Sequence, residues 1–171
     1  MDGADEITGL QTLTLTPIGI IHSENRDAAS TPIQAVCAAG TPGRVEVFEA
    51  YADGLLDVEG FSHLHLLYWL HRATPGPLRI VPYLEDVAHG VFATRSPCRP
   101  NPLGLSVVRL VERRGRVLLV EDVDILDGTP LLDIKPYVER FDGRQGTRCG
   151  WTDRVDAEAF RRRGSRERHE N

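Results

Sequence analysis

The segment 91–106, with the sequence VFATRSPCRPNPLGLS, has the residue types of a stiff ligand-binding loop. Each of its three prolines fixes one backbone torsion and restrains the preceding residue, so the loop loses little entropy when it becomes ordered. Arg95 and Arg99 would be presented from this loop and could bind a carboxylate or a phosphate group. Gly104 would allow another group to approach the backbone closely. The alternative is a stiff connector whose two arginines are only solvated.

A second segment, 124–137, with the sequence DILDGTPLLDIKPY, contains a turn whose residue types have defined roles. Asp127 can cap the turn, Gly128 allows a positive φ, and Pro130 ends it. Turns of this kind also direct backbone N–H groups and a carboxylate into a cavity. A purely structural turn is the alternative.

Two pairs of polar residues lie two positions apart in predicted strands, so the members of each pair share a strand face. His63 and His65 have a spacing that suits two metal ligands, but no third ligand is close in sequence. We therefore predict packed or hydrogen-bonded histidines and no metal site. Asp133 and Lys135 are expected to form an ion pair or a solvated face.

The elements that must position these residues are mostly β-strands. Hydrophobic and β-branched runs predict strands at 13–22, 44–48, 61–71, 91–95, 103–112, 117–125 and 129–137. Residues 113–116 are predicted to join two of these strands as a hairpin. Only 154–163 has the pattern of a helix, with Asp153 as its N-cap. Sequential strands with few helices between them predict a mainly β fold, a single antiparallel β-barrel domain with few short helices.

Several common kinds of site are excluded by their missing motifs. No G-x-G-x-x-G follows a predicted strand and no G-x-x-x-x-G-K-[ST] is present, which excludes ordinary dinucleotide and P-loop sites. The G-x-S-x-G of α/β-hydrolases is also absent. The three cysteines include no C-x-x-C, which argues against a disulfide framework and a cysteine zinc site. The open end of the barrel is then the expected ligand site.

The chain has 171 residues, a mass of 19.0 kDa and a net charge of −5, which fits one acidic domain. Its longest apolar run, near 64–70, is far shorter than the roughly 20 residues that cross a membrane. The acidic, polar start lacks the features of a signal peptide, so a cytoplasmic location is predicted. The charge is uneven, because residues 139–171 contain nine arginines against seven acidic residues. This basic end permits a contact with nucleic-acid phosphates.

Four motifs in order resemble those of the TrmO (TsaA-like) family of methyltransferases that use S-adenosylmethionine. They are Pro17-Ile18-Gly19, FSHL at 61–64, VFATRSPCRPNPLGLS at 91–106 and LDGTPLLDIKPY at 126–137, and together they extend over about 120 residues. The resemblance implies a β-barrel that forms homodimers. It also implies methylation of N6 of threonylcarbamoyladenosine beside the tRNA anticodon, with S-adenosylmethionine as cofactor and tRNA as partner.

The resemblance further implies a cofactor site at the positions that match the motifs of the family. These positions are Pro32, Ile33, Gln34, His71, Arg72, Arg95, Leu105, Asp127, Gly128, Thr129 and Pro130. His71 and Arg72 end the predicted strand 61–71, where a polar pair can reach a ligand. Ile33 departs from the Pro-Arg-Gln that is frequent in the family. Because an acceptor N–H must lose its proton, His71 and Asp127 are the candidate catalytic bases.

These observations divide the chain into a flexible leader at 1–11, a TsaA-like barrel that binds S-adenosylmethionine at 12–140, and a short Arg-rich C-terminal extension at 141–171. Longer bacterial members of the family continue into a separate C-terminal domain, so the sequence resembles a short form without it. The extension could contact tRNA phosphates or be solvated. Two alternatives to tRNA methylation stay open. One is a barrel that binds this cofactor or another nucleotide without catalysis, as a sensor or subunit, and the other is a methyltransferase for a non-tRNA acceptor.

Overall fold

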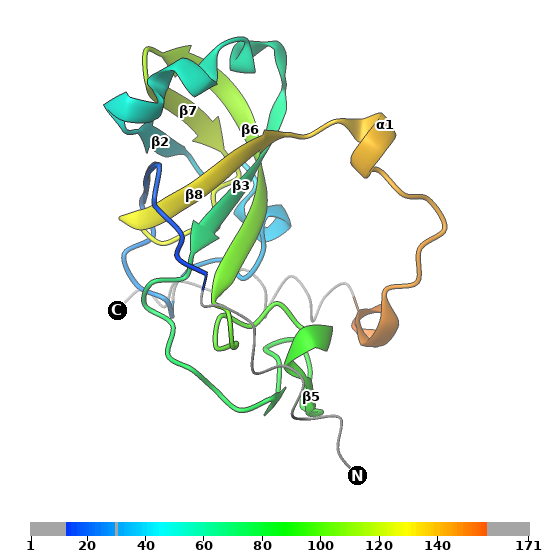
Figure 1. The fold of residues 1–171 in the computed structure, drawn as a ribbon. Coiled ribbons are helices and arrows are strands. Elements are labelled where there is room, and N and C mark those ends of the chain that lie inside the picture. The colour runs from blue at the N-terminus through cyan, green and yellow to red at the C-terminus, as the bar shows by residue number, and fades with distance from the viewer. Residues whose placement is uncertain (1–12, 30, 157–171) are drawn as a thin grey trace, which may run out of the picture.

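Six antiparallel strands form a closed barrel in the computed structural model, which describes residues 13–29 and 31–156 (Figure 1). Neighbours around the barrel follow the order β1-β2-β7-β6-β3-β8, and every pair is antiparallel. The strands are β1 (Gly19–Ser23), β2 (Gly43–Val47), β3 (His63–Trp69), β6 (Leu103–Arg114), β7 (Val117–Glu121) and β8 (Thr129–Pro136). The predicted fold class, a mainly β fold with an antiparallel barrel and few short helices, is confirmed.

Short elements accompany the barrel. The two-residue strands β4 (Arg79–Ile80) and β5 (His89–Gly90) pair with each other in a separate small sheet. The helices of the described residues are η1 (Ala35–Ala38), η2 (Glu49–Leu55), η3 (Val58–Gly60), η4 (Val91–Ala93), α1 (Glu139–Asp142) and η5 (Gly150–Arg154), of which only α1 is α-helical. Not one of these described helices has the length and apolar character to cross a membrane.

The alternation of side chains in β3 shows why this sequence forms a wall of the barrel. Leu64, Leu66 and Tyr68 point inward and are buried, whereas the residues between them face outward. His63 and His65 therefore share a strand face, as predicted, and it is the outer one. All six strands contribute closely packed side chains to the interior, and the burial of these side chains stabilises it. The members from the other five strands are Ile21, Val45, Val47, Val108, Leu118, Val120 and Leu131.

Two local predictions are confirmed by the structure. The hairpin predicted at 113–116 joins β6 to β7, and Gly115 adopts a φ of 62°, which glycine reaches without strain. The ion pair predicted for Asp133 and Lys135 is present on β8, with its charged atoms 2.6 Å apart.

The strand predicted at 91–95 is wrong, because residues 91–93 form the short helix η4. The N–H and the hydroxyl of Thr94 both donate to the carbonyl of Val91, at 3.1 and 2.9 Å, and these two bonds close a turn. The β-branched Val91 is buried there without taking part in a strand ladder. A strand was predicted here because β-branched residues are frequent in strands, a preference that depends on the surrounding structure.

Other predicted boundaries are corrected as well. β1 begins at Gly19 and not at residue 13, and β7 ends at Glu121 because the next residue, Asp122, has a φ of 67°, outside the strand region. Asp153, predicted to be a helix N-cap, lies inside η5. The first three residues of the helix predicted at 154–163 are not α-helical, and the others lie outside the described residues, as does the leader predicted at 1–11.

The segments that carry the predicted site residues meet at one end of the barrel, which we call the site end. Here β1, β3 and β7 end and β2, β6 and β8 begin, so the connections 24–42, 70–102 and 122–128 lie together (lower part of Figure 1). The opposite end is covered by η2 and η3. The antiparallel order of the strands thus gathers residues that are far apart in the sequence.

Gly104 on β6 lies against the ring of Tyr68 on β3, where a Cβ atom would overlap three ring atoms. We expect Gly104→Ala to lower the free energy of unfolding by about 1–3 kcal/mol, because the buried ring has no room to move. Urea unfolding of both proteins measures the difference. Gly54→Ala is the matched control, since a Cβ atom at Gly54 meets nothing within 4 Å. Equal losses in the two variants would contradict this packing argument.

Candidate functional site

A first group of residues at the site end joins two segments that are 61 positions apart in the chain. Arg95 donates a hydrogen bond from Nη1 to Oε1 of Gln34, 2.6 Å away. Gln34 precedes η1 with an extended backbone, and the half-buried Pro32 and Ile33 come directly before it. The Arg95 guanidinium therefore lies beside the segment that the sequence assigned to the same ligand site.

The loop that carries Arg95 is held by contacts within itself. Arg99 donates to the carbonyl of Thr94 at 3.2 Å, and the N–H groups of Ser96 and Cys98 bond to the side-chain oxygens of Thr94 and Ser96, both at 3.3 Å. Together with the prolines, these bonds make the loop a stiff support, as predicted. The guanidinium of Arg99 stabilises the loop, which leaves Arg95 as the anion-binding candidate of this segment.

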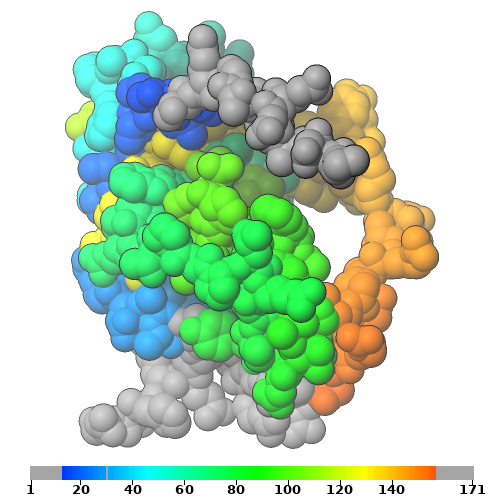
Figure 2. Space-filling model, turned by 60° about the horizontal axis from the view of Figure 1, so that its bottom comes forward, coloured from blue at the N-terminus to red at the C-terminus, as the bar shows by residue number. Residues whose placement is uncertain are grey.

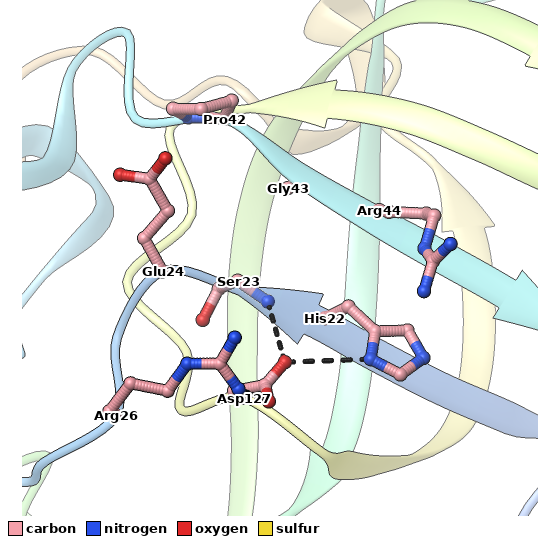
Figure 3. A pocket seen from close by; sticks show the side chains of 8 residues that line it. All are labelled: His22, Ser23, Glu24, Arg26, Pro42, Gly43, Arg44 and Asp127. Carbon is pink, nitrogen blue, oxygen red and sulfur yellow. Dashed lines mark hydrogen bonds and ion pairs between the residues drawn. The ribbon is translucent and has the colours of Figure 1, made fainter.

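A second group surrounds the carboxylate of Asp127 (Figure 3). Its Oδ1 accepts the backbone N–H of Ser23 at 3.1 Å and lies 3.4 Å from Nδ1 of His22. Its Oδ2 forms an ion pair with Arg26. Together with Arg44, these residues line an open hollow of about 490 Å³ on the surface. Both oxygens of Asp127 are thus engaged, and the carboxylate ties its turn to the end of β1.

The turn at 127–130 has the conformation that its residue types predict. Gly128 has a φ of 74° and donates its N–H to the carbonyl of Ile21 at 2.9 Å. Thr129 is buried, and its hydroxyl bonds to a backbone carbonyl of the same turn at 2.7 Å. Pro130 follows as a half-buried residue of β8. The N–H groups of Asp127 and Gly128 and the Thr129 hydroxyl are thus already bonded within the protein.

The remaining predicted site residues lie around the end of β3 and the start of β6. Arg72 donates from Nη1 to the carbonyl of Arg26 at 3.3 Å, which connects it to the second group. The His71 ring contacts the Trp69 ring edge-on, with the ring centres 6.4 Å apart. Leu105 is 58% exposed and faces outward from β6. The structure therefore brings Arg72 to the turn, whereas Leu105 presents an apolar side chain on the surface.

Two buried residues that the sequence did not single out hold the site end together. Ser23 Oγ donates to the carbonyl of Ile125 at 2.6 Å, and Asn25 Nδ2 donates to the carbonyls of Val123 and Ile125 at 3.1 and 3.2 Å. The N–H of Asp127 in turn bonds to the Asn25 carbonyl at 2.8 Å. We call Ser23 and Asn25 the β1 latch. No sequence signal marks them, because they are single polar residues at the start of a polar loop.

The sequence analysis also missed Asp124, a largely buried carboxylate at the site end. Its Oδ1 accepts the hydroxyl of Ser106 at 2.6 Å, and that hydroxyl lies 2.9 Å from the hydroxyl of Tyr68. Burial raises the pKa of the Asp124 carboxyl, while the bond from Ser106, the charge of Arg95 and a backbone hydrogen bond from Ala35 oppose the rise. Its only sign in the sequence is an acidic residue between two apolar ones.

Asp124 also affects the protonation of two neighbours. Burial, and then the charge of Asp124, raises the pKa of the Tyr68 hydroxyl and that of the Cys37 thiol above their ordinary values. Both groups are therefore neutral near pH 7. A raised pKa disfavours the thiolate, which is the nucleophilic form of a cysteine.

The segment that follows β8 returns to the loops of the site end through Trp151. Its indole Nε1 donates to the carbonyl of Ala93 at 2.7 Å, and the ring stacks on His89 with the ring centres 5.0 Å apart. Figure 2 shows an opening between the orange segment and the rest of the molecule. The described part of the extension predicted at 141–171 thus contacts the loop that leads to Arg95.

Metal chemistry has no obvious place in the part of the chain that the structure describes. There, no group of three or more His, Cys, Asp or Glu side chains is arranged to hold a metal ion. His63 Nδ1 lies 2.9 Å from the hydroxyl of Ser62, and the His65 ring is tilted against Tyr137 with the ring centres 5.4 Å apart. As predicted, His63 is hydrogen-bonded and His65 is packed, although the buried Nδ1 of His65 has no hydrogen-bond partner among the described residues.

A family model described as the tRNA-methyltransferase O N-terminal domain matches residues 20–143. The chain belongs to this family. The match extends from β1 through α1, so it includes every barrel strand and both groups of site residues. The family that the four sequence motifs predict, one of methyltransferases, is thereby confirmed.

The matches to individual relatives cover different shares of the lengths of those proteins. A probable S-adenosyl-L-methionine-binding protein of Pyrococcus abyssi is 56% identical over 138 residues, which are 81% of this chain and 75% of that protein. The tRNA (adenine(37)-N6)-methyltransferase of Escherichia coli is 37% identical over 131 residues, 71% of this chain and 56% of that protein. A crystal structure of TrmO from Pseudomonas aeruginosa matches with a TM-score of 0.72 and 36% identity, over 85% of this chain and 64% of that one. The chain thus spans less than two thirds of the length of the E. coli protein and of the Pseudomonas aeruginosa protein.

The raised pKa of Asp124 predicts that its charge lowers stability at neutral pH. Above the folded-state pKa, the carboxylate is charged in both the folded and the unfolded chain, and only the folded chain bears the cost of burial. We therefore expect Asp124→Asn to raise the free energy of unfolding at about pH 8. The gain should shrink as the pH falls through the folded-state pKa and vanish near about pH 4, where the unfolded carboxyl also takes up a proton.

Urea unfolding across this pH range measures the gain. Asp122→Asn is the matched control, since the Asp122 carboxylate accepts the Gly40 N–H at an exposed position two residues away. A variant Asp124→Asn that is less stable than the wild type at every pH would contradict the prediction.

Proposed function

We propose that the site end binds S-adenosylmethionine and that the chain is a methyltransferase that uses it. The residues proposed to contact the cofactor are Pro32, Ile33, Gln34, His71, Arg72, Arg95, Leu105, Asp127, Gly128, Thr129 and Pro130. The observation that supports this most directly is the hydrogen bond from Arg95 to Gln34, which joins two of these segments. The name of the Pyrococcus abyssi relative supports the same ligand.

The chemistry of these residues fits this ligand. Arg95 offers a guanidinium for a carboxylate, and Leu105 offers exposed apolar surface. When bound, the cofactor supplies a methyl group whose transfer releases a neutral thioether. The protein therefore has to position the two reactants and provide a suitable electrostatic environment. The stiff loop around Arg95 and the latched turn are suited to that task, because both are held in place without a ligand.

The proposed acceptor is N6 of a tRNA adenosine beside the anticodon, in its threonylcarbamoyl form. The E. coli relative is named for methylation of adenine 37 of tRNA at N6. The threonylcarbamoyl group is included in this proposal because the sequence motifs resemble those of the TrmO family. The arginines of 139–171 are proposed to contact phosphates of the same tRNA, since charge attraction of this kind positions nucleic acids.

Of the two candidate bases, the contacts favour His71. Both oxygens of Asp127 already face the donors Ser23 N–H, His22 and Arg26. The His71 ring makes an edge-on contact with Trp69. We propose that His71 accepts the proton that leaves N6, and that Asp127 holds the turn in place.

The same face of the barrel suggests how two chains would associate. Trp69, Leu103 and Leu105 are neighbours on the outer wall formed by β3 and β6, and each is between 46% and 58% exposed. Contiguous exposed apolar residues are typical of interfaces. We propose a homodimer through this wall and, since tRNA is the proposed substrate, a cytoplasmic location. We also propose the division at residues 12–140 and 141–171 into a cofactor-binding barrel and an Arg-rich extension.

Binding is tested by thermal unfolding with S-adenosylmethionine, with S-adenosylhomocysteine and ATP as comparisons. At about 100 times the dissociation constant, a ligand adds about 2.7 kcal/mol of stability, so the midpoint should rise by about 5–10 °C with the first two and not with ATP. Arg95→Gln should bind about 10- to 100-fold more weakly, because a charged hydrogen bond is lost. Arg109→Gln is the control, since Arg109 pairs with Glu121 on the outer wall. The absence of a shift in the wild type, confirmed by calorimetry, would contradict the proposed cofactor.

Methyl transfer is tested with radiolabelled S-adenosylmethionine and tRNA that carries or lacks threonylcarbamoyladenosine. We expect label only in the modified tRNA. His71→Gln should lower kcat by about 10²- to 10⁴-fold, a loss far larger than its change in cofactor affinity, because a general base acts in the chemical step. Cofactor binding without transfer to either tRNA would contradict the tRNA proposal. It would favour the two alternatives, a non-catalytic barrel or a different acceptor.

A further inference from the structure

The segment that follows β8 is attached to the site end by a cluster of four side chains. The Trp151 ring lies almost parallel to the His89 ring, at an interplanar angle of 17°. His89 shares a hydrogen bond with Glu85, and Arg154 Nη2 lies 3.8 Å from the same carboxylate oxygen. The side chains of His89 and Glu85 are each less than one fifth exposed. The helix η5 is therefore docked on the loops around β5 and does not merely pass over them (Figure 1).

The same cluster reaches the backbone that carries Arg95. Trp151 Nε1 donates to the carbonyl of Ala93 at 2.7 Å, two residues before Arg95. The neighbouring carbonyls of Val91 and Thr94 accept hydrogen bonds from within the loop, the first from Thr94 and the second from Arg99. The carbonyl of Ala93 thus depends on a donor from beyond β8, whereas the loop itself satisfies the carbonyls on either side.

The chain between α1 and η5 gains little on its way to this contact. Residues 143–149 are all exposed, and Figure 2 shows an opening between this segment and the rest of the molecule. Arg144, for example, donates to the carbonyls of Phe141 and Gly143 in its own turn. Ordering a segment costs conformational entropy, which contacts elsewhere must offset. The contacts that hold this segment near the loop are those of η5, with Trp151 at their centre.

The two functions of the Trp151 side chain can be separated. Stacking on His89 requires an aromatic ring, which a phenylalanine would also provide. The bond to the Ala93 carbonyl requires the indole N–H, which a phenylalanine lacks. The donor is therefore the part of the side chain that acts on the loop of Arg95.

We propose that Trp151 is a positioning residue of the S-adenosylmethionine site, whose indole N–H fixes the backbone from which Arg95 extends. This inference rests on the proposed function. Gln34 holds the guanidinium end of Arg95 at 2.6 Å, and Trp151 holds the backbone two residues before it, so both ends of the side chain are restrained. A side chain that is oriented before the ligand arrives loses less entropy on binding. The Arg-rich extension then supports the cofactor site in addition to its proposed contact with tRNA.

The experiment is a double-mutant cycle on cofactor affinity. Isothermal titration with S-adenosylmethionine is carried out on the wild type, Trp151→Phe, Arg95→Gln and the double variant. We expect Trp151→Phe to weaken binding about three- to tenfold, the effect of one lost hydrogen bond, and to have no effect in the Arg95→Gln background. Thr152→Val is the matched control and should bind as the wild type does. It removes a donor to a backbone carbonyl in the same helix, but that carbonyl, of Cys149, belongs to the extension itself.

The cycle separates positioning from a merely structural role. If Trp151 only stabilised the fold, its replacement would reduce the fraction of binding-competent protein whatever residue stands at position 95. The affinity would then fall by the same factor in both backgrounds. A loss that depends on the presence of Arg95 is expected only if Trp151 acts through it.

The outcomes are distinct. If the wild type does not bind S-adenosylmethionine, the proposed function and this inference are both overturned. If the wild type binds and Trp151→Phe binds equally well, or if the two losses are additive, only this inference is overturned. If Trp151→Phe does not fold, Glu85→Ala replaces it, since it removes the carboxylate that holds His89 and Arg154 beneath η5. Its loss of affinity should likewise disappear in the Arg95→Gln background, and an additive loss overturns the inference.

Discussion

The β1 latch is the interaction on which the rest of the site end depends. Residues 122–128 cross from the end of β7 to the start of β8 outside the regular strand pairing, so their buried carbonyl groups require other donors. Ser23 and Asn25 supply them, with three hydrogen bonds between 2.6 and 3.2 Å. A buried carbonyl without a partner costs about 1–3 kcal/mol, so the latch fixes the path of the whole crossing.

This fixed path gives two carboxylates, three positions apart, different surroundings. Asp124 is turned toward the interior, where it meets Ser106 and the buried Tyr68. Asp127 is turned toward the surface, where Arg26 and the end of β1 engage both of its oxygens. Identical side chains therefore differ in burial and in partners because of where the backbone places them.

The sequence predicted what local patterns determine. Hydrophobic and β-branched runs identified the walls of the barrel, glycine identified the hairpin, and Asp-Gly-Thr-Pro identified the turn at 127–130. Prediction from the sequence failed where the decisive contact joins residues that are far apart in the chain. The latch joins positions about 100 apart, and nothing in the residues around Asn25 indicates the carbonyls that it will meet. The resemblance to the family placed Arg95 and Gln34 in one site, but neither it nor any local pattern predicted the hydrogen bond between them. Val91 shows the opposite failure, in which a local preference for strands lost to hydrogen bonds that close a turn.

The composition of the segment 91–106 becomes understandable through the contacts of its residues. This one segment supplies Arg95 near its start, which bonds to Gln34, and Ser106 at its end, which bonds to Asp124. Gly104 admits the Tyr68 ring, which brings the Tyr68 hydroxyl to Ser106. The prolines between them keep the intervening loop stiff, so the two ends of the segment hold a constant separation. Arginine, glycine, serine and proline thus have separate tasks in one segment, which extends from Arg95 at the site end to Ser106 inside the barrel.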